Sequence, residues 1–160
     1  RYVFAGLDQT SLDITLRADF ALSSDMTIQI YAQPLVASGN YAEFKEFAVP
    51  SSYNFIDYDG PNSSLSFDAN QNTYTADADG AGPGAPVTFF NPDFTIRSLR
   101  TNLVFRWEYI PGSTLFVAWS QSRFTPISNP SFQAFSLLRD LFGDDMRNVL
   151  VVKTSYWLNY

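Results

Sequence analysis

Residues 11–22, which read SLDITLRADFAL, decide the fold of this 160-residue chain. Apolar side chains alternate there with polar and charged ones as far as Leu22. A period of two places the apolar side chains on one face of a β-strand and the charged Asp13, Arg17 and Asp19 on the other. The stretch therefore predicts a strand that separates apolar surroundings from water.

Two hairpins follow from the same pattern. Residues 23–25 suit a tight turn, and alternation resumes in a second strand at Met26, whose end is expected near Pro34 because proline cannot donate a ladder hydrogen bond. Alternation returns at residues 94–109, and residues 110–113 (IPGS) predict a turn before a return strand. Tyr2–Ala5 and residues 149–160 predict the first and last strands.

Two stretches without this period predict long loops, at about residues 38–93 and 123–148. The first is rich in Asp, Asn, Ser, Gly and Pro, although short paired segments near Phe44 and Tyr74 indicate a local hairpin. Within the second, SFQAFSLLRDLFGDD has apolar residues at helical spacing after the start signal Asn129-Pro130-Ser131. It predicts one short amphipathic helix.

Composition excludes several kinds of site. The chain has no Cys, which excludes disulfides, zinc-thiolate sites and thiol catalysis, and no His, which excludes Ser-His triads and His-ligated metals. The net charge of −6 argues against binding to nucleic acid, which needs surplus Lys and Arg. No apolar run is long enough for a transmembrane helix. We expect no cofactor and no enzymatic activity.

The length of the predicted strands favours a membrane-spanning protein over a soluble one. Four predicted strands have about 11 to 13 residues, whereas soluble strands average about 5 to 6 and tilted membrane strands need about 9 to 11. Both tight turns fall at one end of the strands and both long loops at the other, as in outer-membrane barrels. Aromatic residues are expected near both membrane boundaries: Trp107, Tyr109, Tyr156 and Tyr160 near one, and Trp119 and Phe94 near the other. Trp157 is expected to point inward and does not fit this pattern.

These observations predict an all-β fold, an antiparallel transmembrane β-barrel with long extracellular loops and one short helix. Residues 1–160 supply about six strands, fewer than the eight of the smallest single-chain barrels. We therefore expect most of a larger barrel to precede Arg1, or several chains to share one pore. A soluble lectin-like β-sandwich is the alternative.

The barrel interpretation assigns residues to two surfaces. Seven side chains are expected to face lipid: Leu12, Ile14, Leu16, Phe20, Leu103, Phe105 and Trp107. Seven polar side chains are expected to face the lumen: Asp13, Arg17, Asp19, Arg100, Arg106, Glu108 and Lys153. Any such barrel needs a polar interior, so these seven polar residues are expected to keep the lumen hydrated rather than to form a dedicated substrate site.

Two smaller features carry candidate sites. The closing strand ends in an aromatic residue, which resembles the assembly signal of outer-membrane barrels, so Tyr156, Leu158 and Tyr160 are candidates for recognition by the barrel-assembly machinery; an ordinary closing strand is the alternative. Asp77 and Asp79 have the spacing of calcium ligands, as do the aspartates of residues 57–59. Neither pair has the downstream Glu of an EF-hand, and a solvated turn is favoured over a metal site.

Three segments carry a family resemblance: residues 2–41, residues 91–121 with the Arg-Trp strand and its PGS turn, and residues 138–160. They resemble the C-terminal end of a family of uncharacterised bacterial outer-membrane proteins. The resemblance implies an N-terminal domain similar to family-nine carbohydrate-binding modules, followed by an outer-membrane β-barrel. Glycan binding is thereby implied for the region before residue 1, and no catalytic residues carry over.

The functional expectation is an outer-membrane segment that serves porin-like passage, or surface capture, of a polymer such as a glycan. Its expected partners are outer-membrane lipid, the barrel-assembly machinery and other envelope proteins. A structural or interaction subunit of a larger envelope complex is the alternative. An outer-membrane hydrolase is disfavoured by the missing His.

Overall fold

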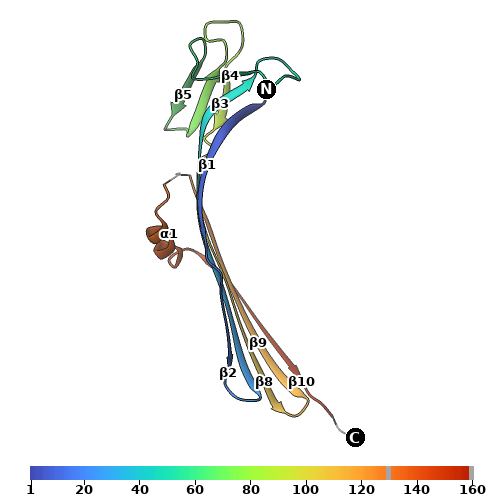
Figure 1. Ribbon diagram of the computed structural model, residues 1–160. Coiled ribbons are helices and arrows are strands. Elements are labelled where there is room, and N and C mark those ends of the chain that lie inside the picture. Colours follow the sequence, from blue (N-terminus) through green and yellow to red (C-terminus); the bar gives the residue numbers. More distant parts are fainter. Residues whose placement is uncertain (129–130, 159–160) are drawn as a thin grey trace. The chain divides into compact units, whose positions relative to one another are not determined.

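The computed structural model describes residues 1–128 and 131–158. Most of them lie in antiparallel β-strands, and the described part of the chain contains one short helix (Figure 1). The chain divides into two compact units. Unit 1 holds residues 1–9 and 39–94 with Ser128, and unit 2 holds residues 10–38, 95–127 and the described residues from Ser131 onward.

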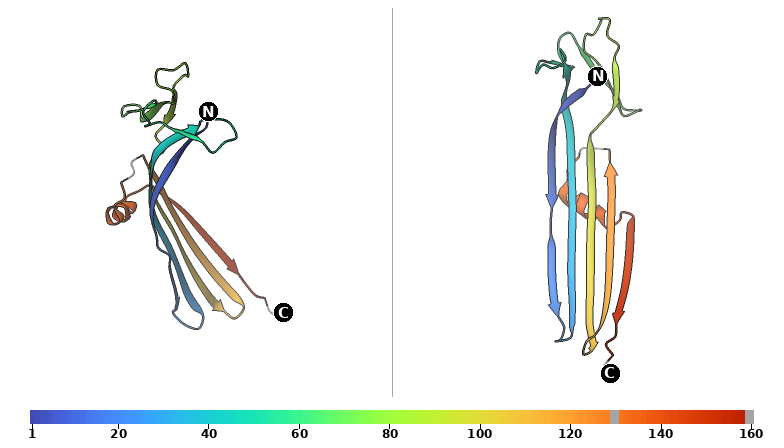
Figure 2. Two further views of the ribbon diagram at one scale, coloured as in Figure 1. Left: turned by 45° about the horizontal axis from the view of Figure 1, so that its top comes forward. Right: turned by 90° about the vertical axis from the view of Figure 1, so that its right-hand side faces the viewer.

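A large sheet has the strand order β1-β3-β8-β9-β10, with β2 and β4 also paired to β3. Its strands are β1 (Val3–Asp13), β2 (Leu16–Ala21), β3 (Met26–Phe47), β4 (Phe55–Asp57), β8 (Phe94–Ile110), β9 (Ser113–Ile127) and β10 (Met146–Ser155). The pairs β2–β3, β8–β9 and β9–β10 are antiparallel, and the long strands of unit 2 lie side by side in Figure 2.

Both predicted tight turns are confirmed. The amides of Leu22 and Ser23 donate to the Met26 carbonyl at 2.9 and 3.3 Å, and the Asp25 amide donates to Ser23 Oγ. Between β8 and β9, Ile110 pairs with Ser113 across Pro111 and Gly112. Gly112 has φ of +80°, which fits the third position of a type II turn and favours glycine there.

The expected strand end near Pro34 is wrong, because β3 continues through Pro34 to Phe47. The interruption falls on the neighbouring edge instead, where residues 14–15 separate β1 from β2. The Ile14 amide donates to the Pro34 carbonyl at 3.1 Å, but Pro34 has no N–H to return the bond. Residues 11–22, predicted as one strand, therefore belong to two strands. The separate first strand predicted at Tyr2–Ala5 is the beginning of β1, which starts at Val3.

The region predicted as a long loop, residues 38–93, contains more strand than expected. Besides the end of β3 and β4, it forms a three-stranded sheet of β5 (Ser64–Asp68), β6 (Thr73–Asp77) and β7 (Val87–Phe90) in sequential order. These strands have four or five residues each, too few for a clear period of two. The second predicted loop, residues 123–148, is likewise shortened by β9 and β10 at its ends.

The core of unit 1 is aromatic. Its buried residues are Phe44, Tyr58, Ala76 and Ala78. The Phe44 ring centroid lies 4.9 Å from that of Tyr74 and 5.2 Å from that of Phe89, so the end of β3 packs against β6 and β7. Aromatic packing between elements distant in the sequence thus holds this unit together.

Gly39, also in unit 1, leaves no room for a side chain. A Cβ there would lie 2.5 Å from an edge carbon of the Phe94 ring and 3.1 Å from Leu7 Cδ1. We expect Gly39→Ala to destabilise unit 1 by about 1–3 kcal/mol through overpacking. Urea unfolding followed by hydrogen exchange in β6 measures this, and Gly6→Ala, where a Cβ meets no atom closer than 3.5 Å, is the control. Equal stability of the two variants would contradict the expectation.

The predicted helix is confirmed as α1 (Ala134–Leu141), with Leu137 and Leu141 buried. It begins after Gln133, which makes no side-chain capping bond; Asn129 and Pro130 of the predicted start signal lie outside the described residues. Two arginines from the sheet hold its C-terminal end. Arg123 Nη1 donates to the carbonyls of Phe142 and Asp144, and Arg97 Nε donates to Asp144 Oδ2 at 3.0 Å.

Removing Arg97 is expected to release α1. The Asp144 side chain is almost buried, so Arg97→Met leaves its carboxylate without its strongest donor and costs about 1–3 kcal/mol. The released helix exposes its backbone, and trypsin cleavage after Arg139 should become faster. Arg100→Met, on the opposite face of β8, is the matched control. Unchanged cleavage in Arg97→Met would show that the ion pair does not hold the helix.

The described residues form an open sheet, not a closed barrel, with β1 and β2 at one edge and β10 at the other. Because β1 and β2 lie end to end along β3, five long rows replace the expected six strands. No helix in the described part of the chain has the length and apolarity needed to cross a membrane.

Candidate functional site

The register of unit 2 divides its side chains between two faces. Residues directly opposite on neighbouring strands share a face. In β8, β9 and β10, Leu103 pairs with Trp119 and Trp119 with Leu150, while the next row joins Phe105, Val117 and Val152. One face of these strands is therefore mainly apolar, and it includes the predicted Leu103, Phe105 and Trp107; the Thr101–Gln121–Asn148 row on the same face is polar.

The other face carries most of the charged residues of these strands, although one of its rows, Val104–Ala118–Val151, is apolar. Its rows, read across β8, β9 and β10, are Arg100–Ser122–Arg147, Asn102–Ser120–Val149, Val104–Ala118–Val151 and Arg106–Phe116–Lys153, with Glu108 opposite Thr114. In the hairpin of β2 and β3, Arg17 pairs with Tyr31 and Asp19 with Gln29. We call this set the polar face.

Two shallow hollows join these rows into one surface. The first, of about 350 Å³, is lined by side chains of three strands: Arg17, Asp19, Gln29, Ile30, Tyr31, Asn102 and Val104. The second, of about 270 Å³, adds the remaining two: Arg100, Asn102, Ser120, Gln121, Ser122, Arg147 and Val149. Asn102 lines both hollows, so the polar face runs continuously from β2 to β10.

Most predicted polar residues have partners on this face. Asp13 accepts hydrogen bonds from Gln33 Nε2 at 3.1 and 3.2 Å, and Arg106 Nη2 lies 3.2 Å from Glu108 Oε2. The Arg17 guanidinium lies 5.4 Å from the centroid of the Tyr31 ring. A surface with these groups can stack on a polar ligand and form hydrogen bonds with it.

The predicted lumen-facing set named charged residues alone. Alternation also places Gln29, Tyr31, Gln33 and Asn102 on the polar sides of their strands, and the structure adds Ser120, Ser122 and Arg147. Arg147 was missed because it lies in the stretch predicted as the second loop, where the structure has the start of β10.

The apolar face is exposed at β2 and β10 and partly exposed along β8 and β9. Leu150 and Val152 are 66% and 61% exposed, and Leu16 and Phe20 of β2 are also exposed. Leu12 and Ile14 lie in the same phase, opposite Asp13. Within the described residues of unit 2, Arg97 and Arg123 attach α1 to β8 and β9, and no second sheet is present. A large uncovered apolar surface marks an interaction with protein or membrane.

The predicted assembly signal lies past the last strand. β10 ends at Ser155, so Tyr156 and Leu158 are exposed and outside it, and Tyr160 lies outside the described residues. The Trp157 amide donates to Ser113 Oγ at 2.9 Å, which ties this segment to the start of β9. Tyr109 Oη adds a hydrogen bond to the Ser155 carbonyl.

The aspartates proposed as weak calcium candidates close a turn in unit 1. Asp79 Oδ2 accepts a hydrogen bond from the Gly84 amide at 2.9 Å, and Asp77 Oδ1 accepts one from the Asp79 amide. The first of these bonds is the main reason that the pKa of Asp79 lies below its usual value. Nowhere in residues 1–128 and 131–158 do three acidic side chains gather as a metal site would require.

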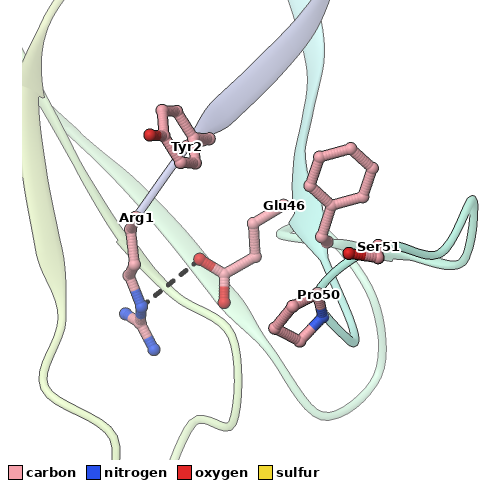
Figure 3. Close-up of a pocket in the computed structure, with 6 residues that line it drawn as sticks. Arg1, Tyr2, Glu46, Pro50 and Ser51 are labelled. Carbon is pink, nitrogen blue, oxygen red and sulfur yellow. Dashed lines mark ion pairs between the residues drawn. The ribbon is translucent and has the colours of Figure 1, made fainter.

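Unit 1 also has a hollow, which the sequence did not predict (Figure 3). It has a volume of about 350 Å³ and is lined by Arg1, Tyr2, Glu46, Phe47, Pro50 and Ser51. Arg1 Nε lies 3.3 Å from Glu46 Oε2, which also accepts a hydrogen bond from the buried Tyr58 hydroxyl at 2.8 Å. Burial and this bond raise the pKa of Tyr58. The surface of the hollow is mostly apolar. The Glu46 carboxylate accepts its hydrogen bond from Tyr58, a residue of the unit 1 core.

Comparison with known proteins gives one match. Residues 1–160 match a family described as a domain of unknown function, DUF5916. No curated protein and no solved structure matches the chain.

Proposed function

This chain belongs to the DUF5916 family, and from the two faces of its large sheet we propose that it is the C-terminal part of an outer-membrane β-barrel. The barrel serves the passage, or the surface capture, of a polymer such as a glycan, and it does so without catalysis. The observation that supports this proposal most strongly is that most of the charged residues of five neighbouring strand rows share one face, whereas the other face is mainly apolar. Lipid on the outside and water on the inside explain both faces together.

The length of the strands supports the proposal that they cross a membrane. β8 has 17 residues and β9 has 15, whereas soluble strands average about 5 to 6. A tilted strand needs about 9 to 11 residues to cross hydrocarbon, so both exceed the requirement and can extend past the membrane surface.

The open edges support a larger barrel. β10 has β9 as its neighbour on one side, and all ten of its residues are exposed. Unpaired backbone groups cannot be tolerated in lipid, so further strands must pair with both edges. In the proposed barrel these strands come from the rest of a larger barrel or from neighbouring chains, and the barrel-assembly machinery inserts them together with this segment.

The polar face supports passage of a polymer with hydroxyl groups. It presents arginine, asparagine, serine and tyrosine side chains, which can donate or accept hydrogen bonds along a continuous track. The family resemblance adds a carbohydrate-binding domain before this segment, which would capture the glycan at the cell surface.

Conductance of the full-length protein in planar lipid bilayers tests passage. We expect stepwise conductance, and we expect Arg106→Glu to shift ion selectivity toward cations because it reverses a charge on the polar face. Arg139→Glu makes the same charge change on α1, away from this face, and should leave selectivity unchanged. A barrel that stays closed with every ligand tried would overturn passage and leave an anchoring role; extraction without detergent would overturn the membrane assignment.

A structural or interaction subunit is the second candidate, and exposed aromatic residues in unit 1 favour it. Tyr53 is 94% exposed, and Phe67 and Phe90 are also exposed at the small sheet. Aromatic side chains of this kind are enriched at protein interfaces. Co-purification of a defined envelope partner that is lost in Tyr53→Ser/Phe90→Ser would favour this function.

A further inference from the structure

Helix α1 has a second apolar side that faces away from the sheet. Leu137 and Leu141 are buried, whereas Phe135 and Phe142 are 90% and 68% exposed. Seven residues make almost two full turns, so the two phenylalanines lie one above the other. A solvent-facing helix side carries polar residues as a rule, and here it carries two large aromatic ones.

The helix lies on the apolar face of unit 2. Arg97 and Arg123, which hold its C-terminal end, have the same phase as Leu99 and Leu103 in the paired strands β8 and β9. The exposed side of α1 therefore lies on the same side of the sheet as the Leu103–Trp119–Leu150 row, with one polar row, Thr101–Gln121–Asn148, between that row and the attachment of the helix. The left-hand view of Figure 2 shows α1 on one side of the strands.

The position of α1 along the strands is that of a membrane boundary. The Leu99–Arg123–Met146 row, where α1 is attached, lies at the opposite end of the apolar rows from Trp107. Eight residues separate Leu99 from Trp107, or about 26 Å at about 3.3 Å per residue. Tilting by 35–45° shortens this to about 20 Å, close to the apolar band of about 25 Å in outer-membrane barrels.

We infer that α1 rests on the outer leaflet of the membrane, with Phe135 and Phe142 inserted among lipid chains just beneath the headgroups. The inference depends on the proposed barrel and adds a lipid-contacting element to it. Two observations favour lipid over a protein partner: the helix is attached on the side of β8 and β9 that carries the apolar rows, and its attachment row lies near the expected membrane-boundary distance from Trp107.

Fluorescent labels on single cysteines test this in the full-length protein. This part of the chain has no cysteine, so each label has one site here; any cysteine elsewhere in the protein is first replaced by serine. The variants Phe135→Cys and Phe142→Cys are labelled and reconstituted in vesicles of phosphatidylethanolamine and phosphatidylglycerol, brominated either near the headgroups or deep in the acyl chains. Leu150→Cys reports the apolar face, and Ser120→Cys reports the polar face. Both phenylalanine positions are exposed, so the substitutions spare the fold.

We expect shallow bromines to quench the labels at 135 and 142 more than deep bromines do, while deep bromines quench the label at 150 more and neither quenches that at 120. Quenching at 150 without quenching at 135 and 142 would overturn the role of α1 and leave the barrel standing. Labels at 135 and 142 that are shielded from water but not quenched would mean that a protein covers the helix, which also overturns it. No quenching at 150 would overturn the proposed barrel itself.

Discussion

Tyr58→Ala is expected to destabilise unit 1 by about 3–5 kcal/mol, the usual cost of deleting a buried aromatic side chain. Tyr58 is fully buried among Phe44, Ala76 and Ala78, so the substitution leaves a cavity in the centre of the core. It also removes the hydroxyl that donates to Glu46. Hydrogen exchange of the β5, β6 and β7 amides in the full-length protein measures the loss.

Tyr53→Ala provides the matched control because Tyr53 is almost fully exposed. Its expected effect is within about 0.5 kcal/mol. Similar protection of the small sheet in both variants would mean that the aromatic core does not hold unit 1 together.

The same tyrosine predicts a dependence on alkaline pH. Burial, followed by the hydrogen bond to Glu46, raises the pKa of Tyr58 above the ordinary value of about 10. The folded state therefore resists deprotonation, so this contribution to stability is complete below pH about 10 and is lost as the pH rises beyond it. Tyr58→Phe should reduce that loss. Burial also raises the pKa of Tyr74, so part of the loss remains.

Protease sensitivity of unit 1 in urea, followed from pH 8 to 11, compares the two proteins. Tyr58→Phe should lower stability by about 1–3 kcal/mol at pH 8, because Glu46 loses its buried donor. A variant that loses stability with pH as steeply as the original protein would show that Tyr58 is not the titrating group.

Val152→Arg and Val151→Arg are expected to differ greatly, although they place the same side chain on neighbouring positions of β10. Val152 pairs with Val117 on the apolar face, and Val151 pairs with Ala118 on the polar face. Both are well exposed, at 61% and 54%. In a barrel, an arginine facing the middle of the membrane costs about 2–4 kcal/mol, whereas a lumen substitution costs little.

Urea titration of the full-length protein, folded into lipid vesicles, measures both variants. The pair separates the membrane from the soluble alternative, because an exposed arginine in water is nearly neutral on either face. Two small and equal effects would show that the apolar face does not meet hydrocarbon.

Alternation predicted the parts of the fold in which neighbouring residues carry the information. The strand around Phe105, the turn at Pro111 and Gly112 and the helix around Leu137 all have local signals, and each is present. The two-faced arrangement of Arg17, Arg100 and Arg106 followed from the same period, since a strand has two faces and the register preserves them.

Unit 1 could not be predicted in this way. Its strands are too short for a period, and Phe44, Tyr74 and Phe89 meet only because β3, β6 and β7 fold together. The contacts of Glu46 with Arg1 and Tyr58 join residues far apart in sequence, which no local pattern reveals. The many Asp, Asn, Ser and Gly residues of this region correctly indicated turns, but the short strands between those turns were not predicted.

Pro34 has a consequence for strand alignment. In a sheet with one apolar and one polar face, a register shift of one residue is disfavoured because it exchanges the two faces. A shift of two residues keeps each side chain on its own face. Pro34 distinguishes between such registers, because it has no backbone N–H and lies opposite Ile14, in the gap between β1 and β2. Sliding by two would move that defect against Leu12 or Leu16, inside a continuous ladder, so this proline selects one alignment among those that the side-chain pattern allows.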